Sequence, residues 1–170
     1  NQPMFSHEGR YVTVYNGEIY NYSEISTRLQ NPGNSGEKLQ LKSSGDTEIA
    51  LEAFVKFGVD FVQLLNGMFA IVIYDTLKKE LFLFRDRVGI KPLFYYWDGK
   101  KFAFASELKA LIAIKGIKKE INTDAVRQFL NLGYIPAPHT IYRNIYKMKS
   151  GHWMKVSAEG LVQNPYWSLS

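Results

Sequence analysis

The sequence reads Asn16-Gly17-Glu18-Ile19-Tyr20-Asn21 directly after the run Tyr11-Val12-Thr13-Val14-Tyr15. β-Branched and aromatic residues dominate that run, which predicts a strand, and the dipeptide Asn16-Gly17 favours a tight turn at its end. An Asn amide beside a Gly backbone N–H has a second use, because two such donors can hold one developing oxyanion. From these residues alone, a plain turn with positive φ and half of an active site both stay open.

Two helices are predicted downstream of this stretch. Asn21-Tyr22-Ser23-Glu24 has the form of a capping box and introduces a helix to about Gln30. After a loop-like composition at residues 31–38, Asp46 has the place of an N-cap, and a second helix is expected to about Phe57. Its apolar positions have the spacing of one buried helix face: Ala50, Ala53, Phe54 and Phe57.

From Met68 onward the pattern changes to strands separated by polar turns, which predicts two hairpins. Both alternate faces of these strands are largely apolar, so each sheet should be covered on both sides. Helices outside a layered sandwich of sheets would meet that demand. The predicted strands are 68–74 paired with 81–84, and 93–97 paired with 102–105.

The last third of the chain begins with two further predicted helices, at residues 107–114 and 123–131. After Gly133 the pattern weakens to short strands and loops with single apolar positions. We therefore expect one unit over residues 1–133 and an extension over residues 134–170 that leads to another part of a longer protein.

Composition limits the classes of function. A chain of 170 residues with 46% hydrophobic residues fits one folded domain, and its apolar runs are too short to span a membrane. The net charge of +5 comes with short lysine groups beside turns, which predicts solvated charge and no nucleic-acid partner. No cysteine is present, and His7, His139 and His152 lack ligand spacing, so no metal site is expected.

Two other segments have both a structural and a functional interpretation. Asp46, within Ser44-Gly45-Asp46-Thr47-Glu48, either caps a helix or holds the ammonium group of a substrate. The segment Arg85–Leu93 either binds an anion or forms a salt-linked crossover whose turn Gly89 and Pro92 fix. Neither segment alone decides between the structural and the functional interpretation.

In this order and spacing, the segments resemble the glutaminase domain of glutamine-hydrolysing asparagine synthetases. The resemblance runs from Gln2 to the end, where Gly133–Pro138 and Gly151-His152 are similar to the passage into the synthetase domain. Relatives that amidate sugars or β-lactam precursors stay possible. The motifs that carry the resemblance are Asn16–Asn21, Gly45–Glu48, Leu65–Ala70, Arg85–Leu93 and Phe104–Ala110.

The resemblance implies a fold and a site. The expected fold class is α+β, a four-layer αββα sandwich of antiparallel sheets with the N-terminal-nucleophile amidotransferase fold, incomplete at the N-terminus. In the family, an N-terminal cysteine attacks the side-chain amide of glutamine. Asn16 and Gly17 correspond to the oxyanion hole, and Glu18 and Asp46 correspond to the carboxylates that recognise the α-amino group of glutamine.

The resemblance also implies what this chain lacks. The nucleophilic cysteine and the arginine for the glutamine α-carboxylate belong upstream of Gln2, so the chain alone should be inactive. The parent is expected to be a cytoplasmic ligase, asparagine synthase, whose C-terminal synthetase domain uses ATP and magnesium; this segment itself needs no cofactor. Missing N-terminal strands would open a sheet edge, which predicts a homodimer or larger assembly. The alternative is a non-catalytic scaffold or binding domain with the same fold.

Overall fold

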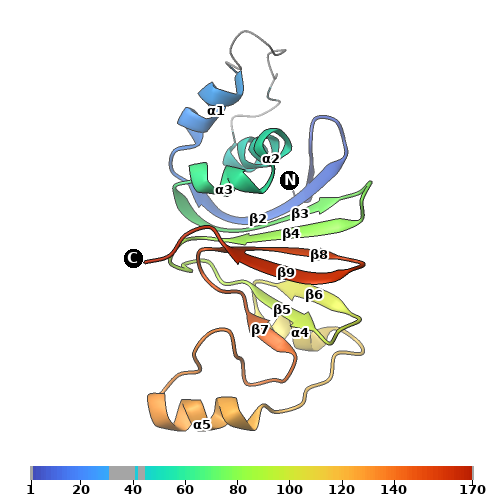
Figure 1. Cartoon of the computed structure of the whole chain (residues 1–170), viewed down its shortest axis with the longest axis vertical. Helices are drawn as coiled ribbons and strands as arrows, with labels where there is room; N and C mark the ends of the chain where they lie inside the picture. Colours follow the sequence, from blue (N-terminus) through green and yellow to red (C-terminus); the bar gives the residue numbers. More distant parts are fainter. Residues whose placement is uncertain (1, 31–40, 42–44, 170) are drawn as a thin grey trace.

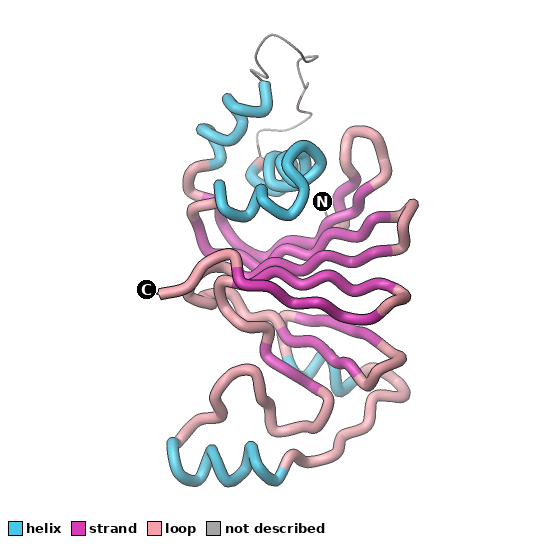
Figure 2. The backbone as a smooth tube through the Cα atoms, viewed as in Figure 1, coloured by secondary structure: helices cyan, strands magenta, loops and turns pink. Residues whose placement is uncertain are grey.

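In the computed structural model of the chain, which describes residues 2–30, 41 and 45–169, two antiparallel sheets lie face to face with helices outside them (Figure 1). The larger sheet has the order β1-β2-β3-β4-β8-β9, and the smaller has the order β6-β5-β7. In Figure 2, where strands are magenta, the strands of the larger sheet lie above those of the smaller one. The strands are β1 (Met4–Phe5), β2 (Tyr11–Ile19), β3 (Gly67–Asp75), β4 (Glu80–Arg85), β5 (Phe94–Trp97), β6 (Phe102–Ala105), β7 (Ile145–Lys147), β8 (His152–Ser157) and β9 (Gly160–Pro165).

Helices form the two outer layers. Three of them, α1 (Tyr22–Gln30), α2 (Asp46–Phe57) and α3 (Phe61–Leu64), lie over the larger sheet, with a short 3₁₀ turn at Gly58–Asp60 before α3 (Figure 1). The fourth, α4 (Leu108–Ala113), packs against the smaller sheet. The predicted four-layer αββα sandwich is therefore confirmed. A further helix, α5 (Thr123–Leu132), lies beyond these layers at the bottom of Figure 1.

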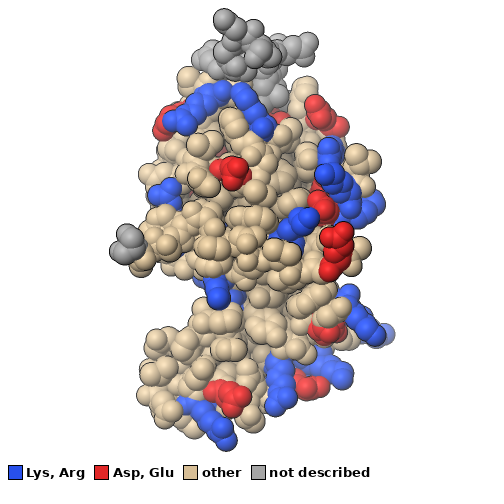
Figure 3. Space-filling model, in the orientation of Figure 1, with Lys and Arg blue, Asp and Glu red and all other residues tan. Residues whose placement is uncertain are grey.

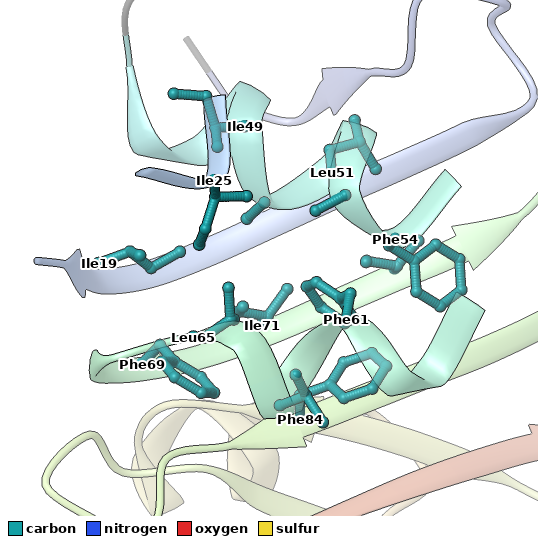
Figure 4. Packing of buried hydrophobic residues seen from close by; sticks show 14 of the residues in the cluster. Ile19, Ile25, Ile49, Leu51, Phe54, Phe61, Leu65, Phe69, Ile71 and Phe84 are labelled. Atoms are coloured by element: carbon teal, nitrogen blue, oxygen red, sulfur yellow. The ribbon is translucent and has the colours of Figure 1, made fainter. Parts of the chain in front are cut away.

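The larger sheet has apolar cores on both faces. Toward the helices, Phe54 of α2 and Phe61 of α3 pack edge-to-face, and Phe61 meets Phe84 of β4 with ring centroids 4.8 Å apart (Figure 4). Toward the smaller sheet, a second cluster includes Val72 and Tyr95. The double-sided apolar pattern of the predicted strands is thus explained, because both faces are covered. Both predicted hairpins are confirmed by the β3–β4 and β5–β6 pairs.

The predicted turn at Asn16-Gly17 is wrong, because β2 continues through both residues to Ile19. Gly17 pairs with Phe69 of β3, and its φ is not in the positive region. A Cβ atom at Gly17 would lie 2.1 Å from the backbone oxygen of Met68. Glycine is required here by the close approach of two strands, and not by a turn.

The starts of both predicted helices differ from expectation. The side chain of Asn21 does not cap α1; it donates to the Leu64 oxygen and accepts from the Asn66 N–H, both at 2.9 Å. The N-cap of α2 is Gly45, so Asp46 is the first helical residue and not the cap. Both polar side chains are drawn away from their local helix ends by tertiary partners. The loop predicted at residues 31–38 lies outside the described residues.

Residues 134–170 contain the short strands that were predicted, and the structure gives them places inside the sandwich. β7 pairs with β5 in the smaller sheet, and β8 pairs with β4 in the larger one. Strands from the end of the chain therefore complete both sheets. Within the described residues, no helix is long and apolar enough to cross a membrane.

Candidate functional site

The candidate site lies along the edge of β2 that faces away from β3. At Thr13 this edge is paired with Met4 of β1. Two residues on, the Gln2 side chain takes the place of a strand: its amide nitrogen donates to the Tyr15 oxygen at 2.7 Å, and its amide oxygen accepts from the Tyr15 N–H at 2.8 Å. Another four residues on, the Ile19 N–H donates to the Asp46 carboxylate at 3.1 Å.

Gly17 lies between these two occupied positions. Successive backbone N–H groups of a strand alternate in direction, so the N–H of Gly17 points the same way as those of Tyr15 and Ile19. Phe69, which pairs with Gly17 on β3, supports this direction. Both backbone groups of Phe69 are bonded to Asp86 and so point away from β2, which leaves Gly17 without a backbone hydrogen bond to β3. Within the described part of the chain, no partner is found for the Gly17 N–H. Among the described residues it is a donor without a partner, in a strand that is paired on its other edge.

Asp46 reaches this edge from the first turn of α2. Its Oδ2 accepts the Tyr15 hydroxyl at 2.7 Å and the Ile19 N–H at 3.1 Å. A carboxylate in the first helical turn also lies favourably for the helix dipole. Burial, followed by the hydrogen bond to Asp46, raises the pKa of Tyr15 well above its usual range. The Tyr15 hydroxyl therefore stays protonated and donates.

Glu18 and Asp46 face a common cavity of about 540 Å³, which Gly17, Tyr20 and Tyr22 also line. The Glu18 side chain is exposed and has no hydrogen bond to the described residues. Tyr20 and Tyr22 are 56% and 40% exposed, so the cavity is open to solvent. Two acidic residues that line one open cavity can attract a small cationic group, and the volume is in the range of small-molecule sites.

Asn16 lies on the other face of β2. It lines a smaller cavity of about 170 Å³ between the two sheets, together with Gln2, Tyr15 and Ser106. Its side-chain amide has no hydrogen bond within the described residues, so it can donate to a ligand. The structure thus brings Gly17, Glu18 and Asp46 to one cavity, with Asn16 in a neighbouring one at the adjacent strand position.

The segment Arg85–Leu93 supports the site from the far side of β3. The Asp86 carboxylate is fully buried and accepts four backbone N–H groups, from Phe69, Gly89, Ile90 and Lys91. Arg85 donates to the backbone oxygens of Gly89, Lys91 and Met148. Arg85 and Asp86 bind backbone groups and form no ion pair with each other in the described residues, so the predicted salt link is not what fixes this crossover. Asp86 holds Phe69, the residue that faces Gly17.

Sequence reasoning missed Tyr15 and Gln2. Tyr15 fits the β-branched and aromatic run that predicts the strand, and only the packing of α2 on β2 brings its hydroxyl to Asp46. Gln2 precedes β1 and has no periodic signal. The sequence offers one hint of a role for Tyr15, because an aromatic ring with a polar hydroxyl stands immediately before the Asn16-Gly17 pair.

Lys and Arg side chains are dispersed among Asp and Glu over the face seen in Figure 3. Within residues 2–30, 41 and 45–169, no group of three His, Cys, Asp or Glu side chains could hold a metal ion.

Solved structures and a family model define the class of this fold. The chain matches a glutamine phosphoribosylpyrophosphate amidotransferase from B. subtilis with a TM-score of 0.62 and 19% identity, over 98% of this chain and 32% of that one. The fold is that of the N-terminal-nucleophile amidotransferases. A family model described as a glutamine amidotransferase domain matches residues 1–167, so the chain belongs to the glutamine amidotransferase domain family.

Two curated relatives show which members of this family the chain resembles. The chain is 34% identical to asparagine synthetase (glutamine-hydrolysing) 3 of Bacillus subtilis, over 94% of this chain and 25% of that protein. It is 44% identical to a Methanocaldococcus jannaschii protein provisionally named asparagine synthetase (glutamine-hydrolysing) 2, over 82% of this chain and 26% of that protein. It is a glutamine amidotransferase domain related to asparagine synthetases, and it spans about a quarter of the length of these relatives.

Proposed function

We propose that this chain is the glutamine-binding, ammonia-releasing domain of a glutamine-hydrolysing asparagine synthetase. The observation that carries the proposal is the open edge of β2, where the free Gly17 N–H lies between an occupied strand position and the Asp46 carboxylate. The names of the relatives supply the acceptor, aspartate, only by similarity.

In the proposed reaction, water replaces the side-chain amine of glutamine, giving glutamate and ammonia. Attack on the amide carbon places negative charge on its oxygen, which the Gly17 N–H and the Asn16 amide stabilise. Glu18 and Asp46 hold the α-ammonium group in the larger cavity. The sequence has no cysteine, so a thiolate nucleophile comes from outside residues 1–170. ATP and magnesium act in the synthetase part of the parent protein.

An amidotransferase-fold scaffold without catalysis is the second candidate, because residues 1–170 contain the fold but no cysteine nucleophile of their own. The two candidates differ in what the full-length gene product does with glutamine. The enzyme releases glutamate and ammonia, and the scaffold releases neither.

The deciding experiment measures glutamate, ammonia and asparagine formed by the full-length protein, with and without aspartate and ATP. We expect glutamine turnover and asparagine in equal amounts when all substrates are present. Turnover of glutamine without asparagine would refute aspartate as the acceptor, and absence of turnover would establish the scaffold. The chain of residues 1–170 tested alone should bind glutamine without hydrolysing it.

A further inference from the structure

The carboxylate of Asp46 has two oxygens in different surroundings. Oδ2 is occupied by the Tyr15 hydroxyl at 2.7 Å and by the Ile19 N–H at 3.1 Å. Within the described residues, Oδ1 accepts only the Thr47 hydroxyl, at the long distance of 3.5 Å. The two oxygens are therefore not equivalent: one is held by the protein, and the other is left for a ligand in the cavity.

We propose that Tyr15 is a positioning residue for recognition of the substrate ammonium group, because its hydroxyl fixes Oδ2 of Asp46 and presents Oδ1 to the substrate. This inference rests on the proposed function, in which Asp46 binds the α-ammonium group of glutamine. Tyr15 itself does not touch the substrate.

Tyr15 can fix the carboxylate because Tyr15 is itself held. Both of its backbone groups are bonded to the Gln2 side chain at the edge of β2. Its ring packs against the apolar core between β2 and the helices. Its hydroxyl stays protonated at every working pH, since burial and the neighbouring Asp46 disfavour the phenolate. The donor therefore has one position and one protonation state.

A fixed carboxylate binds a cation better than a rotating one. The terminal torsion of an Asp side chain is otherwise broad, and ordering it on binding costs free energy. Two hydrogen bonds on one oxygen remove that freedom before the substrate arrives. Glu18, which lines the same cavity and has no hydrogen bond to the described residues, supplies a second negative charge but lacks such fixed geometry.

The test is Tyr15→Phe in the full-length protein, which removes one hydroxyl and keeps the ring. We expect the KM for glutamine to rise about tenfold with kcat unchanged, the size of effect typical of a lost hydrogen bond to a charged group. The inhibition constant of 4-carbamoylbutanoate, which is glutamine without its α-amino group, should stay the same. Equal weakening of both ligands would reveal a merely structural role and overturn the proposal.

Tyr11→Phe is the matched control. Tyr11 lies on the same face of β2, its ring contacts Phe54, and its hydroxyl has no hydrogen bond within the described residues. A KM for glutamine that rises no more in Tyr15→Phe than in Tyr11→Phe also overturns the proposal.

Asp46→Asn separates this inference from the proposed function. If Asp46→Asn leaves the KM for glutamine unchanged, the proposed substrate-binding role of the cavity fails. If Asp46→Asn raises that KM strongly while Tyr15→Phe does not, only the role of Tyr15 fails.

Discussion

The start of α2 and the crossover between β4 and β5 each contain an aspartate that accepts backbone N–H groups. These two residues, Asp46 and Asp86, differ in how many protein donors their carboxylates bind. Asp86 is fully buried and accepts four backbone N–H groups with its two oxygens. Asp46 is half-buried, and only its Oδ2 is firmly bound. The number of protein donors on each oxygen distinguishes a carboxylate that holds the fold from one that is available to a ligand.

The two regions meet at Gly17. On one side, Asp86 binds both backbone groups of Phe69, the β3 residue that faces Gly17. On the other, the Gly17 N–H lies at the edge where Asp46 binds Ile19. A rigid support behind the strand and a partly free carboxylate beside it are both needed, because an oxyanion donor stabilises charge only when it is fixed in advance.

The largest expected effect separates the two aspartates by stability. Asp86→Ala leaves four backbone N–H groups without their acceptor, of which that of Phe69 is buried and the other three are partly buried, so the free energy of unfolding should fall by about 3 kcal/mol or more. Asp46→Ala removes two hydrogen bonds at a half-open site and should cost about 1 kcal/mol. Urea unfolding of the chain measures both. A larger loss for Asp46→Ala would contradict the comparison.

The next effect concerns the glycine between them. In Gly17→Ala, the added Cβ would lie 2.1 Å from the Met68 oxygen and 2.7 Å from the Phe69 Cα, so β2 and β3 must move apart. Overpacking of this kind should reduce the free energy of unfolding by about 2 kcal/mol and abolish glutamine turnover in the full-length protein.

Gly9→Ala is the control for this variant. Its φ is +74° and no atom lies within 4 Å of the added Cβ, so backbone strain of about 1 kcal/mol is expected without loss of activity. If Gly17→Ala behaves like Gly9→Ala, the close approach of the strands does not matter for the site.

The smallest effect is on tyrosine ionisation. Tyr15 beside Asp46 and Tyr166, which donates to the Arg85 oxygen at 2.8 Å, both have a pKa raised by burial above the ordinary 10.0. The fold thus favours both protonated phenols. Their contribution to stability is complete below pH 10 and is lost as the pH rises toward their folded pKa values.

Ultraviolet titration of tyrosinate distinguishes the two regions. Asp46→Asn removes the charge beside Tyr15, so one tyrosine should ionise at lower pH than in the unaltered chain. Tyr166 has burial and the charge of Asp86 as its main causes, and its titration should not change. A variant curve identical to that of the unaltered chain would show that Asp46 does not act on Tyr15.

The periodicity of apolar residues predicted helices and strands well where the local sequence alone decides the structure. The apolar spacing of Ala50, Ala53 and Phe54 predicted α2, and the double-sided apolar pattern of β3 predicted a sheet covered on both faces. Local signals failed where a distant partner intervened. Asn21 has the form of a cap, but its amide is bound by Leu64 and Asn66.

Some residues of the candidate site were predicted from the sequence, and others were found only in the structure. The resemblance named Asn16, Gly17, Glu18 and Asp46, and the structure brings the last three to one cavity. Their chemical roles stay predictions. Nothing in the spacing of Tyr15 or Gln2 indicated their contacts, because hydrogen bonds across 31 and 13 residues depend on how the helix and the chain start pack on β2.

The sequence by itself determined the family, the sandwich of sheets and helices, and the residue types of the site, because hydrophobic period and motif order are properties of the chain. Only the tertiary structure decided that Asn16-Gly17 lies within a strand, that Asp86 is a structural carboxylate, and that Tyr15 holds Asp46. Each of these depends on which groups remain for a polar atom to bond once strands and helices have packed, and that is settled by segments far apart in the chain.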